Sequence, residues 1–509
     1  MNSPSAGSRS VWMTTVLPKF PILQEKLETD VCVIGGGIAG LTAAYLLSRE
    51  GRSVVLIDAA EIGCGETGRT TAHFFPPDNR YFEIEDAFGA ENARLVAESF
   101  QQATALVETI VEQEGIDCES EQLNGYLFSL NPEGNADLDR EFEAARKAGV
   151  EIGKKGQVPD VSFITGPCLE FRNQAQFHPL KYLGGLIEAF RRKGGSIYTR
   201  TRALDISRCG TALKVITESG SIVAHAVVVA TNTPFNDDVV MHTKQAAYRT
   251  YVVGIRVPKG SVPRILLWDN GDPYHYIRLT TPDDKSEEEI LVVGGADHKV
   301  GQDEHPVHRY DEIEAWVRKR YPMAGPVDFK WSGQVMEPAD GIGYMGRNPM
   351  DDKNVYVITG DSGNGMTHCT AGAMVVTDLI MGRDNAWQDL YDPARKPIHG
   401  MPEFLQELGN TVMQYADWVK GGDVESPAQI QPGKGAILRQ GGRKLAVYRD
   451  DNGVLHAFSA ACTHMGCVVS WNAAETSWDC PCHGSRFSVS GEVLHGPAVM
   501  PLEAAQVDP

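Results

Sequence analysis

The sequence predicts an α/β domain of Rossmann-like topology, an α+β domain whose segments alternate with it, and a small all-β domain at the end of the chain. Three observations carry this prediction. A glycine-rich turn joins a strand to an apolar helix near the N-terminus, and two similar strand-and-turn segments occur much later in the chain. Short strands separated by Gly-Gly and Asp-Asn-Gly turns occupy residues 428–509, as hairpins require. A chain of 509 residues has room for about three such units.

Composition indicates a water-soluble protein. The chain is 42% hydrophobic and 22% charged, which is ordinary for globular proteins. Its net charge of −20 argues against nucleic acid or an anionic membrane surface as a partner. The longest uncharged apolar run, Val31–Leu47, contains three consecutive glycines, so we expect no membrane span. No signal peptide is recognisable, and six scattered cysteines suggest free thiols, so we expect a cytoplasmic protein.

The N-terminal glycine-rich turn has the full context of a dinucleotide site. A strand ends at Gly35, the pattern G-x-G-x-x-G opens an apolar helix, and a second strand ends at Asp58. Gly35 permits the tight turn, Gly37 lets the backbone approach a pyrophosphate, and Gly40 lets helix and strand pack closely. The helix N-terminus favours the phosphates, and Asp58 is placed to bind a ribose. This fingerprint does not distinguish FAD from NAD.

A second match to the same pattern, Gly341-Ile-Gly343-Tyr-Met-Gly346, lacks this context. No apolar strand precedes it, and the polar segment RNPMDD follows where a helix should begin. We therefore predict a loop here rather than a second dinucleotide site.

Three further segments favour FAD by resemblance. They are Gly63–His73, Val227–Thr233 and Val355–Thr367, which together with the N-terminal unit resemble the D-amino-acid-oxidase/glycine-oxidase family of FAD-dependent amine oxidoreductases over residues 30–385. The resemblance implies that FAD is bound and that some of these residues contact it. Thr70, Thr71 and Ala72 would lie near the flavin ring, Ala230 near the adenosine end, and Gly360, Asp361, Gly363, Gly365 and Met366 beside the ring and its ribityl chain.

The C-terminal region contains two Cys-His pairs. Cys462 and His464 form the first pair, and Cys480 and His483 form the second. Two thiolates and two imidazoles are the ligand set of a Rieske [2Fe–2S] centre. A structural zinc site is the alternative, since cysteine and histidine pairs also bind zinc.

The segments CTHMGC and CPCHGS resemble the Rieske domains of cytochrome bc complexes and ring-hydroxylating oxygenases, over residues 428–509. By this resemblance the iron ligands are Cys462, His464, Cys480 and His483. Cys467 and Cys482, at matching offsets, would form the disulfide found in the bc type. Ser485 would donate a hydrogen bond to cluster sulfur, and the segment 496–498 would cover the cluster. High-potential members have a tyrosine where this chain has Phe487, which cannot donate a hydrogen bond, so we expect a lower potential.

These assignments predict the following division of the chain. Residues 1–25 form an N-terminal arm, 385–427 form a linker with a docking helix (FLQELGNTVMQYADWV), and 428–509 form the Rieske domain. The FAD-binding domain comprises 26–80, 162–236 and 330–384, and the substrate domain comprises 81–161 and 237–329.

The sequence indicates the substrate-binding residues less clearly than the cofactor sites. The resembled family transfers hydride from the carbon beside an amine to the flavin, so we expect an amine or amino-acid substrate. A carboxylated amine would favour an arginine, and Arg278 on a predicted strand is a candidate. His73, His178 and His298 are further pocket candidates, although a structural histidine is the simpler interpretation of each.

Three functions are compatible with this combination, which resembles a recurring bacterial architecture. In the leading hypothesis an amine reduces FAD, and the Rieske centre passes the electrons singly to an external acceptor that remains unidentified. An NAD(P)H-dependent reductase is the second hypothesis, and a redox sensor that gates a partner is the third. A Rieske oxygenase is disfavoured because no mononuclear-iron motif of two histidines and a carboxylate stands out.

Overall fold

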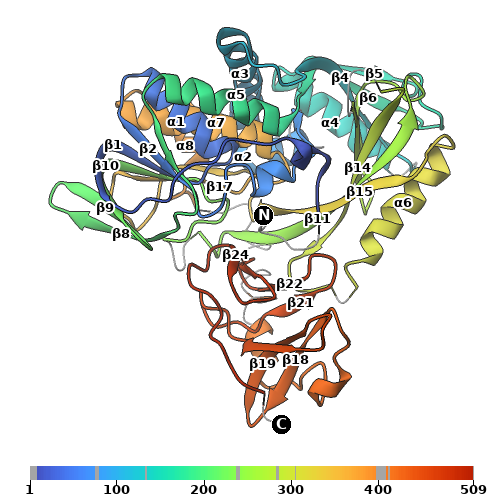
Figure 1. Cartoon of the computed structure of the whole chain (residues 1–509). Helices are drawn as coiled ribbons and strands as arrows, with labels where there is room; N and C mark the ends of the chain where they lie inside the picture. Colours follow the sequence, from blue (N-terminus) through green and yellow to red (C-terminus); the bar gives the residue numbers. More distant parts are fainter. Residues whose placement is uncertain are drawn as a thin grey trace.

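The structure is a computed structural model that describes residues 8–74, 80–131, 134–236, 241–281, 286–303, 305–396, 409–410 and 413–507. Within these residues the strands form four sheets. The two large sheets build an upper body, and the two small sheets build a C-terminal body that lies beneath it in Figure 1. No helix within the described ranges is both long and apolar enough to cross a membrane.

The first large sheet has the order β16-β17-β10-β1-β2-β7, and its strands from β17 to β7 are parallel. The buried half of β1, Val-Cys-Val-Ile, is continuously apolar because parallel strands are covered on both faces. Helices α1, α5 and α7 pack together on this sheet (Figure 1). The bounds are β1 Lys26–Ile34, β2 Val54–Ile57, β7 Ser196–Tyr198, β8 Ala203–Cys209, β9 Ala212–Thr217, β10 Ser221–Val229, β16 Tyr344–Arg347, β17 Val355–Thr359, α1 Ile38–Arg49, α5 Pro179–Arg192 and α7 Gly365–Met381.

The second large sheet has the order β15-β11-β14-β13-β12-β4-β6-β3, with β5 on β6, and is mostly antiparallel. Its bounds are β3 His73–Phe74, β4 Glu121–Phe128, β5 Ile152–Lys155, β6 Cys168–Gln176, β11 Gln245–Pro258, β12 Leu266–Asp269, β13 His275–Thr280, β14 Glu288–Lys299 and β15 Val327–Pro338. The associated helices are α2 Tyr81–Phe88, α3 Ala90–Glu114, α4 Asn135–Lys147 and α6 His308–Arg320.

The strand pairing differs from the predicted domain division at three places, the shortest being β3, which lies within 26–80 but pairs with β6. β6 falls within 162–236, and most of β15 falls within 330–384, both of which we expected in the FAD-binding domain. Both strands belong instead to the second sheet, because β6 pairs with β4 and β15 pairs with β11. These pairings join distant segments, so they are decided by tertiary contacts and not by local pattern.

The C-terminal body contains only strands and short turns among its described residues, as the sequence predicted. One sheet holds β18 Lys434–Gln440, β19 Arg443–Arg449 and β20 Leu455–Ser459. The other holds β21 Ser470–Asn472, β22 Ser477–Asp479, β23 Arg486–Phe487 and β24 Val493–His495. In Figure 1 the sheet that contains β21, β22 and β24 lies next to the upper body, and β18 and β19 lie farther from it.

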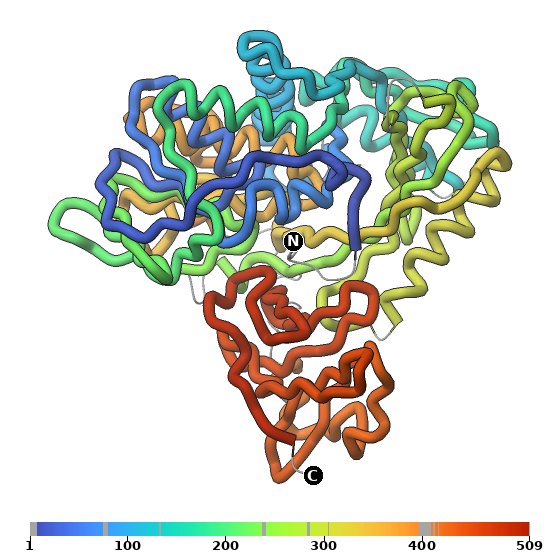
Figure 2. Tube along the Cα trace, in the orientation of Figure 1, coloured from blue at the N-terminus to red at the C-terminus, as the bar shows by residue number. Residues whose placement is uncertain are grey.

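The N-terminal arm is an integral part of the fold. Trp12, in the short helix η1 (Val11–Thr14), is fully buried, and its Nε1 donates to the carbonyl of Thr70 at 2.6 Å. Figure 2 shows the arm crossing the front of the upper body and descending toward the C-terminal body. The arm therefore touches both bodies of the molecule.

The predicted docking helix, residues 404–419, lies only partly within the described residues. In the described part, Tyr415 Oη donates to the carbonyl of Met465 at 2.8 Å, and Trp418 Nε1 donates to that of Gly466 at 3.0 Å. The end of this segment is thus attached to the loop that carries the first Cys-His pair. Short helices here are α8 Gln388–Tyr391, η4 Ala416–Trp418 and η5 Pro427–Gln429.

Candidate functional site

A cavity of about 780 Å³ lies where the two large sheets and the C-terminal body meet. Its volume is typical of a site for a small molecule or cofactor. It is lined by the N-terminal glycine-rich turn, by the segment 65–73, by β10 and β17 at their carboxyl ends, and by residues 488–499 of the C-terminal body. These five segments of the sequence therefore line one cavity.

The glycine-rich turn forms one end of the cavity and fits the predicted nucleotide. Gly35 has φ of +110°, and a Cβ there would lie 2.3 Å from the carbonyl oxygen of Ala230. A Cβ on Gly40 would lie 1.9 Å from the carbonyl oxygen of Gly35, so this glycine serves helix-strand packing and does not line the cavity. Asp58 lines the cavity and accepts from the backbone N–H of Gly36 at 2.6 Å. Burial raises the pKa of Asp58.

The other end is closed by the N-terminal turn of α7. Asp361, Gly363, Gly365 and Met366 line the cavity there, so the partial positive charge of this helix end faces into it. Burial raises the pKa of Asp361 to about 7, although its Oδ1 accepts from the backbone N–H of Met336 at 3.1 Å. Thr70, Thr71 and Ala230 also line the cavity, as the resemblance implied. Ala72 and Gly360 lie next to lining residues but do not line it themselves.

The wall contributed by the second sheet carries hydroxyl and aromatic groups. Tyr276 Oη and Thr250 Oγ1 are hydrogen-bonded at 2.7 Å, and Tyr274 Oη donates to Asp297 Oδ2 at 2.8 Å. Burial raises the pKa of Asp297 to about 6. His73 lines the same region, and burial lowers its pKa to about 3, so its ring is neutral near pH 7.

The other predicted pocket residues lie elsewhere. Arg278 is buried, and its Nη1 donates to the carbonyls of Thr71, Ala72 and Phe177, so its guanidinium holds the flavin-side segment in place and does not face the cavity. His178 caps α5 by accepting from the backbone N–H of Lys181. His298 shares a hydrogen bond with Tyr251 at 2.9 Å, away from the cavity.

The two Cys-His pairs come together in the loops that follow β20 and β22. The rings of His464 and His483 lie 5.1 Å apart between centroids. A hydrogen bond between Cys480 and Cys462 lowers the pKa of Cys462 to about 7 and raises that of Cys480, so the two sulfurs lie side by side. The two pairs are separated in the sequence, and the fold brings their two sulfurs and two imidazoles together.

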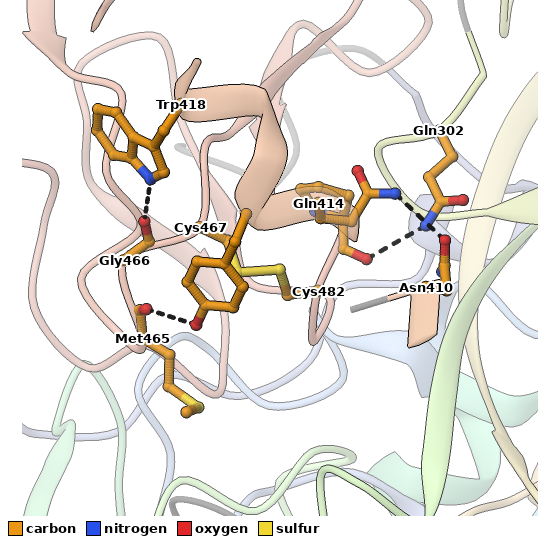
Figure 3. The surroundings of a disulfide bond; sticks show 10 residues. Gln302, Asn410, Gln414, Trp418, Met465, Gly466, Cys467 and Cys482 are labelled. Atoms are coloured by element: carbon orange, nitrogen blue, oxygen red, sulfur yellow. Dashed lines mark hydrogen bonds between the residues drawn. A yellow bond between two sulfur atoms is a disulfide. The ribbon is translucent and has the colours of Figure 1, made fainter. Parts of the chain in front are cut away.

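The predicted disulfide between Cys467 and Cys482 is formed and joins the two ligand loops (Figure 3). The sulfur of Cys480 lies within 4.8 Å of both disulfide sulfurs. Because those two sulfurs are bonded to each other, they are not thiolate ligands, and the predicted donor set is still Cys462, Cys480, His464 and His483.

Two further features match the expected surroundings of the cluster. A hydrogen bond from Ser485 lowers the pKa of Cys462, and Ser485 Oγ also accepts from the backbone N–H of Ala498 at 3.0 Å. The segment 496–498 is thereby held against the ligand loop, as the resemblance implied. Phe487 is fully buried in β23.

Buried charges attach the C-terminal body to the upper body. Glu475 is fully buried, and its Oε1 accepts from Ser332 Oγ and from Ser8 Oγ, the latter at 2.6 Å. Its Oε2 lies 3.8 Å from Arg69 and 3.6 Å from Arg486. Burial opposes ionisation, but these two guanidiniums and that of Arg249 hold the pKa of Glu475 below its ordinary value.

Sequence reasoning missed the residues that the second sheet and the C-terminal body contribute to the cavity. The aromatic residues of Tyr274–Arg278 are visible in the sequence, but no local pattern predicts that they line this cavity. The missed lining residues from these two parts include Thr250, Tyr274, Tyr276, Gln334, Glu492 and His495.

Both cofactors that the sequence implied fit these sites. The N-cap residue of α1, Gly37, has no side chain to occupy this helix end, and Gly35, Gly37 and Ala39 line the cavity, so a phosphate can approach the backbone there. The N–H of Ile38 donates to Thr67 Oγ1 at 3.0 Å. The buried Nδ1 of His483 makes no hydrogen bond within the described part of the chain, as expected of a metal-ligating atom.

Comparison with known proteins agrees with this geometry. The model of the family described as FAD dependent oxidoreductase matches residues 30–379, and the model of the Rieske [2Fe-2S] domain matches residues 421–506. The chain belongs to the FAD-dependent oxidoreductase family. It is an FAD-dependent oxidoreductase with a C-terminal Rieske domain, so FAD and a [2Fe–2S] cluster are its cofactors, and the zinc alternative is set aside.

Individual relatives extend the match over the whole chain. YhfW of Bacillus subtilis (strain 168), named as a Rieske 2Fe-2S iron-sulfur protein, is 35% identical over 98% of this chain and 97% of its own length. Gamma-glutamylputrescine oxidoreductase of Escherichia coli (strain K12) is 26% identical over 71% of this chain and 86% of its own. The crystal structure of glycine oxidase from Geobacillus kaustophilus has a TM-score of 0.60 at 18% identity, covering 73% of this chain and 99% of that one, which shows a shared fold.

Proposed function

We propose that this protein oxidises a C–N bond of an amine or amino acid at FAD and passes the electrons through its Rieske cluster to an external acceptor. The observation that carries the proposal is the shared cavity: residues 488–499 of the Rieske domain form a wall of the cavity that the dinucleotide motifs also line. A one-electron centre next to a flavin site supports an acceptor other than oxygen alone. The printed name of the Escherichia coli relative, an oxidoreductase of gamma-glutamylputrescine, supports an amine substrate.

The bound FAD would accept hydride from the substrate, and the bound cluster would carry electrons one at a time. The protein itself supplies orientation, exclusion of water and fixed charges. The α7 N-terminus is directed at the ring end of the cavity and would stabilise negative charge there. His73, kept neutral by burial, offers a hydrogen-bonding edge without a positive charge.

The charges around the cavity favour an amine over an α-amino acid. Carboxylate recognition ordinarily uses a guanidinium that is open to the ligand. The two arginines that line the cavity are engaged, Arg69 with Ser8 and Ser332 and Arg202 with the carbonyl of Val493. Of the arginines nearby, Arg80 is engaged with Glu337 and Ser362, and Arg278 with three backbone carbonyls.

Carboxyl groups and aromatic rings are arranged on the same side. Asp361 lines the cavity, and Asp297 lies behind Tyr274. A substrate ammonium would be stabilised by these carboxylates and by the faces of Tyr274 and Tyr276. Loss of the ammonium proton must precede hydride transfer, and a carboxylate with a pKa raised toward 7, such as that of Asp361, is suited to accept it.

An anaerobic absorbance experiment tests the proposal. The holoprotein is mixed with a panel of primary and secondary amines, with the corresponding amino acids, and separately with NADH and NADPH. We expect an amine to bleach the flavin first and then the cluster. Bleaching by a reduced nicotinamide alone would refute the proposal and establish a reductase instead.

A matched variant separates the two cofactors in this experiment. Cys462→Ser removes one cluster ligand from a loop that does not line the flavin cavity. The variant should still show flavin bleaching by the amine but no turnover with a one-electron dye as acceptor. Unchanged turnover with the dye would show that electrons leave directly from the flavin.

A further inference from the structure

The second Cys-His loop of the Rieske domain packs directly against strands β11 and β15 of the upper body. Gly484, next to the ligand His483, has φ of +77°, and a Cβ there would lie 2.6 Å from Ala247 Cβ in β11. It would also lie 2.7 Å from Gln334 Nε2 in β15. The backbone of the ligand loop thus touches two neighbouring strands of the second sheet, with no space for a side chain between them.

Gln334 joins this loop to the flavin cavity. It lines the cavity, is only 2% exposed, and its Nε2 donates to the carbonyl of Gly484 at 3.2 Å. Its backbone N–H donates to Glu66 Oε2 at 2.6 Å, and Glu66 lines the cavity as well. A buried amide nitrogen is costly unless it is hydrogen-bonded, and its oxygen acceptor here is the carbonyl of the ligand loop, with Met336 Sδ farther away at 3.9 Å. The Oε1 of Gln334 has no hydrogen-bond partner among the described residues.

His242 of the upper body packs against both histidines of the cluster site. The ring of His242 lies 4.7 Å from that of His464 and 5.3 Å from that of His483, between centroids. His242 and His483 are both buried. His464 is half-buried, so His483 is the ligand that the upper body covers most completely.

We infer that Gln334 is a positioning residue for electron entry into the Rieske centre: it holds the His483 loop against the flavin cavity, so that transfer from flavin to cluster takes place across this wall. With both cofactors bound, the reduced flavin would be the donor and one ferric ion of the cluster the acceptor of a single electron, with no atom transferred. The second electron would follow by the same route after the external acceptor has reoxidised the cluster. This inference rests on the proposed function for the direction of electron flow, from flavin to cluster. Its new content is the role of Gln334 and the part of the cavity wall across which the electron passes.

Two variants of Gln334 test the inference. Gln334→Leu removes the donor, and Gln334→Glu keeps the size of the side chain but presents a second acceptor to the Gly484 carbonyl. The control is Gln302→Leu. Gln302 Nε2 donates to the carbonyl of Pro481 in the same ligand loop at 3.5 Å, from an exposed position outside the flavin cavity (Figure 3).

The flavin of the anaerobic holoprotein is reduced by a light flash with deazaflavin and EDTA, so that no substrate is needed. Flavin and cluster absorbance are then followed in time. FAD content and the EPR signal of the dithionite-reduced cluster are measured for each variant, so that loss of a cofactor is not mistaken for slow transfer. We expect both Gln334 variants to slow cluster reduction by roughly tenfold, the effect of one lost buried hydrogen bond on an equilibrium, while Gln302→Leu keeps the wild-type rate.

Wild-type rates in both Gln334 variants would overturn the inference and leave the proposed function standing. Equal slowing in Gln302→Leu would also overturn it, because the effect would then belong to the ligand loop in general. If the flash-reduced flavin of the wild-type protein passes no electron to the cluster, the proposed function itself fails.

Discussion

Glu475 provides the sharpest test of how the Rieske domain is held in place. Glu475→Gln preserves the shape of the side chain and the ability to accept from Ser8 and Ser332, but it removes the negative charge. Arg69 and Arg486 would then lie buried at 3.8 and 3.6 Å from a neutral group. Removing one partner of a fully buried ion pair costs about 3–5 kcal/mol, which raises the undocked population roughly 10²-fold or more.

Hydrogen exchange followed by mass spectrometry measures this population. Peptides spanning 472–486 and 327–338, on the two sides of the contact, should exchange roughly 10²-fold faster in the variant, because protection there depends on the local opening equilibrium. Peptides from β1 should be unchanged. Glu503→Gln, at an exposed carboxylate of the same domain, is the matched control. A change below about threefold in Glu475→Gln would refute the reasoning, since it would mean that the buried charges balance without this carboxylate.

Three further predictions concern the cofactor sites and pH. Gly35→Ala places a Cβ 2.3 Å from the Ala230 carbonyl and strains a backbone at φ +110°, so FAD affinity should fall by at least about tenfold in a fluorescence titration; wild-type affinity would contradict the assigned turn. His483→Ala should abolish the cluster's EPR signal while FAD absorbance persists, and a retained signal would exclude this ligand. Because guanidiniums hold the pKa values of Glu475 and Asp479 below ordinary carboxyl values of about 4, their contribution to docking is complete above that range and is lost as the pH falls through the lowered values. Exchange at the interface should therefore accelerate only below about pH 4, and acceleration beginning near pH 6 would point to other groups.

Local sequence was sufficient for the parts of the site that act through backbone geometry or through ligand chemistry. The turn at Gly35 and Gly37 is recognisable because a pyrophosphate requires backbone approach that only glycine permits. The four iron ligands are recognisable because two thiolates and two imidazoles at short spacing have few other uses. The second glycine pattern was also interpreted correctly: Gly341 and Gly343 lie in a turn that leads into β16, not into a helix.

The local sequence did not predict the orientation of side chains. Arg278 lies on the predicted strand, but its guanidinium binds three backbone carbonyls, because the strand presents it to the segment 71–72 and not to the cavity. The periodicity of a strand shows which residues share a face, and it does not show what that face meets.

The sequence by itself therefore indicated a dinucleotide site and two Cys-His pairs, since each depends on residues that lie close together in the chain. FAD, the [2Fe–2S] cluster and the disulfide followed from the resemblance of these motifs to known families. Only the tertiary structure decided which distant segments meet: β6 and β15 in the second sheet, residues 488–499 on the flavin cavity, and Gln334 beneath the ligand loop. The physical reason is that such contacts depend on burial and charge pairing summed over the whole molecule, so the local sequence of one segment does not identify the segment that it contacts.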